Sequence, residues 1–160
     1  MTRELIGFAL VLLVFVIALR VLRANRALRS DQEDYLPAPQ QSRGGVEIGD
    51  VLYVSTVFSS APLDRVWAHG LGARGKSKLF ASNEGLSIER RGEADLFIPT
   101  EAARGITRES ATIDKGVEPG GLIAIHWTLG STEVTTNLRS AGNTKDLIKQ
   151  IRELTGERFG

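Results

Sequence analysis

The densest group of residues with binding chemistry is a short basic run in the middle of the chain, Arg74-Gly75-Lys76-Ser77-Lys78. Lysine and arginine side chains bind phosphate groups, and a glycine lets backbone N–H groups approach an anion closely. Arg74, Lys76 and Lys78 are therefore candidate contacts for an anionic lipid headgroup. A solvated loop that binds nothing is the competing interpretation, because most runs of charge are solvated.

Few other residues suit catalysis or metal binding. The chain has 160 residues, no cysteine and two histidines, His69 and His126. The lack of cysteine excludes a disulfide framework, a thiolate metal site and a cysteine nucleophile, and neither histidine has metal-ligand or triad partners at a recognisable spacing. We predict no catalytic residue, metal or cofactor, and hence a protein that is not an enzyme. The net charge of +1 provides no field that would attract nucleic acid.

The N-terminal segment is the strongest signal in the sequence. Fifteen residues from Leu5 to Leu19 carry no polar side chain. A helix over residues 5–22 is about 27 Å long, close to the hydrocarbon thickness of about 30 Å. We predict a transmembrane helix over residues 5–22 that contacts the lipid bilayer. A cleaved signal peptide is the alternative, but arginines follow the apolar run where small cleavage-site residues would be expected.

The orientation of this helix follows from the arginines beside it. Arg20, Arg23, Arg26 and Arg29 lie after the apolar run, and only Arg3 precedes it, next to Glu4. Positively charged flanks stay in the cytoplasm. We predict a single-pass plasma-membrane protein with residues 1–4 outside and the C-terminal part in the cytoplasm. The four arginines are also expected to contact anionic headgroups, at about 1 kcal/mol each.

The composition of residues 23–45 predicts a basic juxtamembrane segment followed by a flexible linker. From Ser30 to Gly45 the chain is rich in Ser, Asp, Gln, Glu, Pro and Gly, a composition that buries little. Residues 46–160 then form a domain with a net charge of −1.

Most of this domain shows the pattern of short strands separated by turn residues. The predicted strands are 51–58, 78–82, 86–90, 96–98, 106–114 (as one strand or two), 122–129 and 133–138. Side-chain alternation assigns their faces. The residues of the sixth strand that should face the core are Ile123, Ile125, Trp127 and Leu129. The residues of the last strand that should face water are Glu133, Thr135 and Asn137.

The period changes to that of a helix near the C-terminus. Asn143 is a favourable N-cap, Gly156 is placed where a helix ends, and apolar residues recur between them at helical spacing. The predicted fold is thus an N-terminal transmembrane α-helix followed by a mainly-β domain with about six or seven antiparallel strands and a C-terminal amphipathic helix. This is the plan of a pleckstrin-homology-like (PH-like) fold.

Several segments resemble a known family. They are Arg65–Gly72, Ser82–Ile88, Ile98-Pro99, Gly120–Ile123, His126–Gly130 and Glu133–Arg139. With the N-terminal helix, they make the chain similar to actinobacterial single-pass membrane proteins that carry a cytoplasmic bacterial PH-like domain. The resemblance implies an architecture, and it brings no assigned biochemical activity.

Three functions are consistent with this sequence. The first is a non-enzymatic adaptor or scaffold that binds a membrane or membrane-proximal protein at the cytoplasmic face of the plasma membrane. The second is a sensor of anionic lipid headgroups that uses the basic run together with the juxtamembrane arginines. The third is an accessory subunit whose helix packs within a larger membrane complex.

Overall fold

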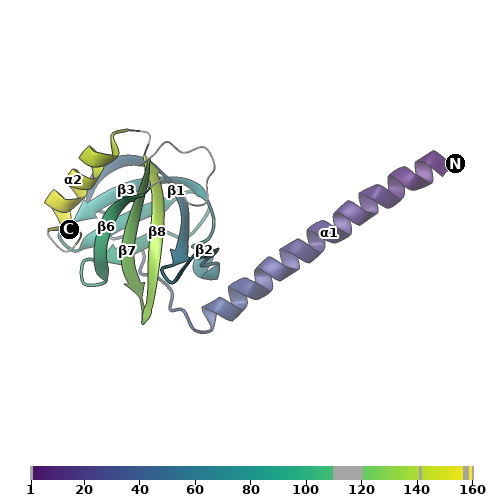
Figure 1. Cartoon of the computed structure of the whole chain (residues 1–160), viewed down its shortest axis with the longest axis horizontal. Helices are drawn as coiled ribbons and strands as arrows, with labels where there is room; N and C mark the ends of the chain where they lie inside the picture. Colours follow the sequence, from purple (N-terminus) through teal and green to yellow (C-terminus); the bar gives the residue numbers. More distant parts are fainter. Residues whose placement is uncertain (1, 110–120, 141, 157–158, 160) are drawn as a thin grey trace.

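The computed structural model describes residues 2–109, 121–140, 142–156 and 159. Helix α1 (Thr2–Glu33) projects from a compact β-rich body (Figure 1). It is long and apolar enough to cross a membrane, and its apolar side chains from Ile6 to Leu22 are exposed. The helix runs eleven residues beyond the predicted span, and its C-terminal end reaches the domain.

The body is one antiparallel sheet that curls around a single core. Its strands are β1 (Val46–Phe58), β2 (Ala61–Arg65), β3 (Gly75–Ser82), β4 (Gly85–Arg90), β5 (Leu96–Pro99), β6 (Ala103–Glu109), β7 (Leu122–Leu129) and β8 (Thr132–Ser140). Their order is β5-β4-β3-β1-β8-β7-β6, and β2 pairs with β1. Strand β1 joins the two halves, because its first part pairs with β3, its last part pairs with β8, and a bulge lies between Tyr53 and Ser55.

Helix α2 (Thr144–Thr155) packs beside the sheet against β1, β3, β4 and β7 (Figure 1). Its predicted start is confirmed, since the Asn143 side chain accepts a hydrogen bond from the Lys145 backbone N–H at 3.0 Å. Gly156 caps the other end, also as predicted. Leu147, Ile148 and Ile151 are buried in the core. A long apolar helix, an antiparallel sheet and a C-terminal helix confirm the predicted fold class.

The sequence missed one strand. β2 is short and mostly exposed and contains Pro62 and Asp64, so it lacks the apolar alternation by which strands are recognised. The predicted strand 106–114 is confirmed as far as Glu109, and its remainder lies outside the described residues.

The predicted core face of β7 is confirmed, because Ile123, Ile125, Trp127 and Leu129 are all nearly inaccessible to solvent. The prediction that Thr135 and Asn137 face water is wrong. Their exposed fractions are only 7% and 9%. Side chains from the β1–β2 hairpin, including Phe58 and Pro62, line a pocket on that side of the sheet and cover these two residues.

The segment expected to be a flexible linker lies against the domain. Leu36 is 1% exposed and belongs to the core. The Gln40 carbonyl accepts a hydrogen bond from the Phe97 backbone N–H at 2.8 Å, and the Arg43 backbone N–H donates to the Ser87 hydroxyl at 3.1 Å. Polar composition concealed these contacts, because they use one leucine and several backbone groups.

Candidate functional site

Two of the predicted basic residues, Lys76 and Lys78, lie on strand β3, and the third, Arg74, directly precedes it. Lys76 and Lys78 are exposed and alternate with the less exposed Gly75 and Ser77, so their side chains share a face, and Arg74 is exposed beside them in the chain. We call this set the basic stripe. The structure brings its members together, but the geometry alone does not test headgroup contact.

Acidic residues surround one end of the basic stripe. The Lys78 ammonium donates to the Glu47 carboxylate at 2.8 Å. That hydrogen bond, with the attraction of the same carboxylate, raises the pKa of Lys78 above its ordinary value. In the sheet, Lys78 also lies between Asp50 of β1 and Glu89 of β4. These carboxylates offset the positive charge that a phosphate would need.

A second polar cluster fastens α1 to the domain, and we call it the joint. The side-chain oxygen of Gln32 accepts hydrogen bonds from the backbone N–H groups of Trp67 at 2.5 Å and Ala68 at 3.1 Å. Its side-chain nitrogen donates to the Arg65 carbonyl at 3.4 Å. These groups lie at the start of the 3-10 helix η1 (Ala68–Gly70), whose first N–H groups have no partner within the helix.

Glu33 and His69 form the other half of the joint. The Glu33 carboxylate accepts from the His69 backbone N–H at 2.9 Å and from the Arg29 guanidinium at 2.9 Å. These two hydrogen bonds, that of Arg29 first, lower the pKa of Glu33 below its ordinary value. The His69 ring nitrogen Nε2 in turn bonds the Leu36 carbonyl at 2.9 Å. Glu33, at the end of α1, and Leu36, just beyond it, are thereby both hydrogen-bonded to His69.

Buried side chains of the domain hydrogen-bond to the backbone of η1 and of the residue that follows it. His69 has a positive φ of 53°, which costs energy for a residue with a side chain. The Arg90 guanidinium, which is 6% exposed, donates to the carbonyls of Gly70 at 2.8 Å and His69 at 3.4 Å. The Tyr53 hydroxyl donates to the Leu71 carbonyl at 2.8 Å, and burial raises the pKa of Tyr53 to about 12. The surface that receives α1 is therefore rigidly supported.

The four juxtamembrane arginines occupy a continuous helix and not a disordered flank. Arg20, Arg23 and Arg26 are exposed on α1 just beyond the apolar stretch. Arg29 differs from them because it pairs with Glu33, and that carboxylate belongs to the joint. The prediction treated the four arginines alike, whereas in the structure Arg29 also contributes to docking the helix.

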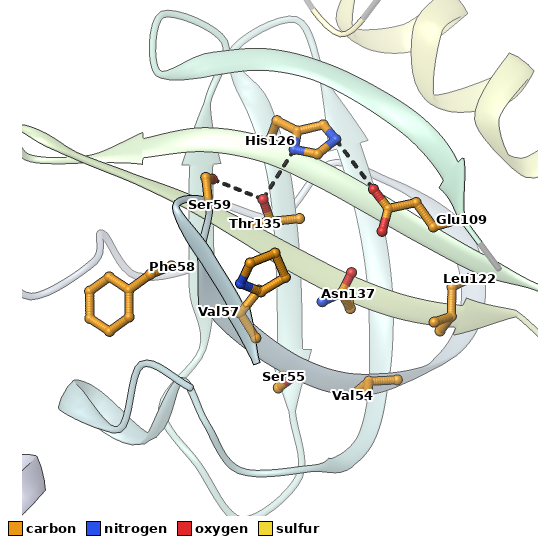
Figure 2. A pocket seen from close by; sticks show the side chains of 11 residues that line it. Val54, Ser55, Val57, Phe58, Ser59, Glu109, Leu122, His126, Thr135 and Asn137 are labelled. Carbon is orange, nitrogen blue, oxygen red and sulfur yellow. Dashed lines mark hydrogen bonds and ion pairs between the residues drawn. The ribbon is translucent and has the colours of Figure 1, made fainter. Parts of the chain in front are cut away.

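A pocket of about 160 Å³ lies on the outer side of the sheet, between β1, β6, β7 and β8 and the start of β2 (Figure 2). Its polar wall consists of Ser55, Ser59, Glu109, His126, Thr135 and Asn137. Its apolar wall consists of Val54, Val57, Phe58, Pro62 and Leu122. Ser55 is fully buried, and its hydroxyl has no hydrogen-bond partner among the residues that the structure describes.

His126 forms a fixed part of the pocket wall. Its Nδ1 lies 3.1 Å from the Thr135 hydroxyl and its Nε2 lies 3.0 Å from the Thr107 hydroxyl. Glu109 approaches Nε2 at 4.0 Å, and the Thr135 hydroxyl is also bonded to Ser59 at 2.9 Å (Figure 2). Both ring nitrogens therefore have partners, which favours a positioning role for His126 over proton transfer. Within the described ranges, no three His, Asp or Glu side chains are placed to hold a metal ion.

Sequence reasoning missed both the joint and the pocket. Gln32 and Trp67 are separated by 35 positions, and Ser55 and Asn137 by 82 positions, so only the folded chain brings them together. The one available signal was alternation on β8, which placed two polar residues opposite the core. It could not reveal that the β1–β2 hairpin covers them.

A curled antiparallel sheet with a C-terminal helix packed against it, preceded by an apolar helix, defines a PH-like domain with a candidate membrane anchor. The sequence agrees, because residues 33–154 match the family model described as "Bacterial PH domain-like". This match covers about three quarters of the chain, and the chain belongs to that family. PH-like domains are typically non-catalytic binding domains. A comparison with curated proteins finds no match.

Proposed function

We propose that this chain is a non-enzymatic adaptor or scaffold, anchored in the plasma membrane by residues 5–22, whose PH-like domain binds a protein at the cytoplasmic face. The joint is the observation that carries the proposal. A flexible tether would only keep the domain nearby, whereas side-chain bonds from Gln32 and Glu33 to η1 give it one orientation relative to α1. A fixed orientation favours docking to a partner in the same membrane, because less freedom is lost on binding.

The length of α1 supports the same proposal. From Leu22 to Glu33 an upright helix rises about 16 Å, which exceeds the headgroup layer of about 5 to 7 Å on each side of the bilayer. The joint would therefore stand in the aqueous phase. The carboxylates beside Lys78 also weaken the competing proposal of a headgroup sensor at the basic stripe.

The surface that receives the partner is proposed to be a strand edge. The edge of β5 is engaged by Gln40. At the other end of the sheet, β6 has exposed side chains at Arg104 and Arg108, and one of its carbonyls, that of Ile106, accepts from Arg152 at 3.3 Å. An added strand could pair with the remaining backbone groups of β6.

Photocrosslinking in native membranes tests this proposal. The photoreactive amino acid benzoylphenylalanine would replace one residue of the full chain at a time: Arg108 on β6, Lys76 on the basic stripe, Phe15 in α1, and Glu153 on α2 as a control. We expect a discrete protein adduct from position 108 and none from position 153. Lipid adducts at position 76 without a protein adduct at 108 would contradict the adaptor and favour the sensor. Protein adducts from position 15 alone would favour the accessory subunit.

The proposed orientation has a separate test. Alkaline phosphatase fused after Gly160 should be inactive, because the enzyme matures only outside the cytoplasm, and a cytoplasmic reporter at the same position should be active. Active phosphatase would contradict the N-terminus-out orientation proposed from Arg20 to Arg29.

A further inference from the structure

Beyond its apolar stretch, α1 has a charged half and an apolar half. Each of the four juxtamembrane arginines lies three residues after the last, which is about 60° short of a full turn, so together they span about 180° of the helix. The opposite half carries Val21, Ala24 and Leu28, which are all exposed. Leu28 is 47% exposed although it lies six residues beyond the predicted span. The domain therefore leaves this apolar half of α1 uncovered.

The apolar half continues along the helix with the spacing of a coiled coil. Alternating steps of four and three residues connect six exposed side chains, and we call this set the seam: Leu10, Val14, Ile17, Val21, Ala24 and Leu28. Such spacing keeps one face of a helix against a parallel neighbour. Every face is apolar within the apolar stretch, so Val21, Ala24 and Leu28 determine which face is the seam. The next step leads to Asp31, where a charge ends it.

The seam fits a second copy of this chain in charge and in depth. Two copies that met through their charged halves would bring arginines together, and like charges repel. Through the seam, Arg20 of one copy instead lies beside the uncharged Asn25 of the other, and the remaining arginines point away. Because the apolar stretch and the arginines sit at the same depth in both copies, the helices are parallel and unshifted, so Leu28 meets Leu28.

We propose that α1 pairs with α1 of a second copy through the seam, which makes the protein a parallel dimer in its membrane. Val14 and Val21 occupy equivalent positions of the heptad, and β-branched residues there favour two helices. Gln32 and Glu33 hold the domain beyond the last residue of the seam, so the pairing uses none of the contacts of the joint. The inference goes beyond the adaptor function and does not depend on it, because the pairing involves α1 alone.

Disulfide crosslinking of the full chain tests the pairing, because the chain has no cysteine of its own. Single cysteines replace Leu28 on the seam and Ser30, which is exposed at almost the same depth on the charged half. Paired helices lie about 8 to 10 Å apart, so cysteines at position 28 come within disulfide range while those at position 30 stay about 14 Å apart. In isolated membranes treated with a mild oxidant, Leu28→Cys should form a species of twice the chain mass with about tenfold higher yield than Ser30→Cys.

A second pair of variants tests whether the seam drives the contact. In the Ala24→Cys chain, Leu28→Glu should lower the yield of crosslinked dimer about tenfold, because it removes a leucine contact and places two carboxylates face to face. Ser30→Glu adds the same charge on the other half and should leave the yield unchanged. The urea midpoint of the domain should be the same in both variants, since Leu28 and Ser30 are exposed.

Co-expression of two differently tagged copies identifies the occupant of the seam. A disulfide-linked pair that carries both tags supports the second copy. Adducts at position 28 with a different protein would overturn the proposal and assign the seam to the accessory-subunit arrangement. Equal crosslinking at positions 28 and 30, no crosslinking at position 28, or an unchanged yield in Leu28→Glu would also overturn it. Nanodiscs that hold one chain each give the unpaired reference and should yield no crosslinked species.

Discussion

The two ends of α1 differ in the polarity of their side chains and in their contacts with the domain. From Ile6 to Leu22 the side chains are apolar and exposed, and this half of the helix lies away from the domain (Figure 1). From Arg29 to Leu36 the chain is mostly polar, yet Gln32 and Glu33 bond to η1 and Leu36 is buried in the core. The first end is long and apolar enough to cross a bilayer, whereas the second end is hydrogen-bonded to the domain. One helix can therefore set both location and orientation.

The largest expected effect lies at the domain end. Leu36→Ala should lower the free energy of unfolding of the domain by about 2 to 5 kcal/mol, since it leaves a cavity in a packed core. Urea denaturation measures this change. The neighbouring substitution Tyr35→Ala is the control, because Tyr35 is 61% exposed and should have little effect. Equal stability of the two variants would mean that residue 36 belongs to a free linker.

The next effect lies at the bilayer end. Val14→Arg places a charge near the middle of the apolar stretch, which costs about 3 kcal/mol for insertion into a membrane. The protein should become extractable from membranes by alkaline carbonate, while its domain keeps the same urea midpoint. Val14→Leu should remain in the membrane. Retention of Val14→Arg after carbonate treatment would contradict the assignment of residues 5–22 as the anchor.

A smaller effect is expected within the joint. Gln32→Ala removes the acceptor of the Trp67 and Ala68 backbone N–H groups, and each such hydrogen bond contributes about 1 kcal/mol. Hydrogen exchange at these two amides should become about tenfold faster, because η1 opens more often. Asp31→Ala, one residue away and exposed, should leave exchange unchanged. Unchanged exchange in Gln32→Ala would show that the joint does not protect the turn.

The smallest effect is a dependence of the joint on pH. The pKa of Glu33 is lowered in the folded protein by the hydrogen bonds from Arg29 and His69. A carboxyl group with a lowered pKa stabilises the folded arrangement above its ordinary pKa and loses that contribution as the pH falls through the lowered value. Protection of the His69 amide, taken relative to the intrinsic exchange rate at each pH, should therefore fall in acid. Glu33→Gln should remove this acid dependence, and an identical pH profile in that variant would contradict the assignment.

The sequence predicted the elements better than it predicted their contacts. The apolar run, the alternation in β7 and the Asn143 cap depend on neighbouring residues, and each was confirmed at the level of structure. The joint and the pocket depend on which distant segments meet. A glutamine such as Gln32 looks the same in a solvated linker as in a joint, so its role appears only when η1 is placed beside it.

For the basic stripe, the sequence showed the charged residues but not the neighbours that they acquire in the fold. Its charge was conspicuous in the sequence, but the residues that offset it lie on other strands. Glu47 and Asp50 are on β1 and Glu89 is on β4, and strand pairing brings them beside Lys78. Sheet register therefore decides how much of a local charge run remains available to a ligand.

The proposed adaptor requires α1 to be a continuous helix that holds the domain in one orientation relative to the membrane. Because the chain has no cysteine, single cysteines can be introduced at Ala24 on α1 and at Leu63 on β2, both exposed, and spin-labelled in lipid nanodiscs. Double electron–electron resonance spectroscopy then measures the distribution of distances between the two spin labels. We predict one narrow distribution that broadens when Gln32→Ala and Glu33→Gln are combined. A broad distribution in the otherwise unchanged chain would contradict the claim and restore the flexible tether.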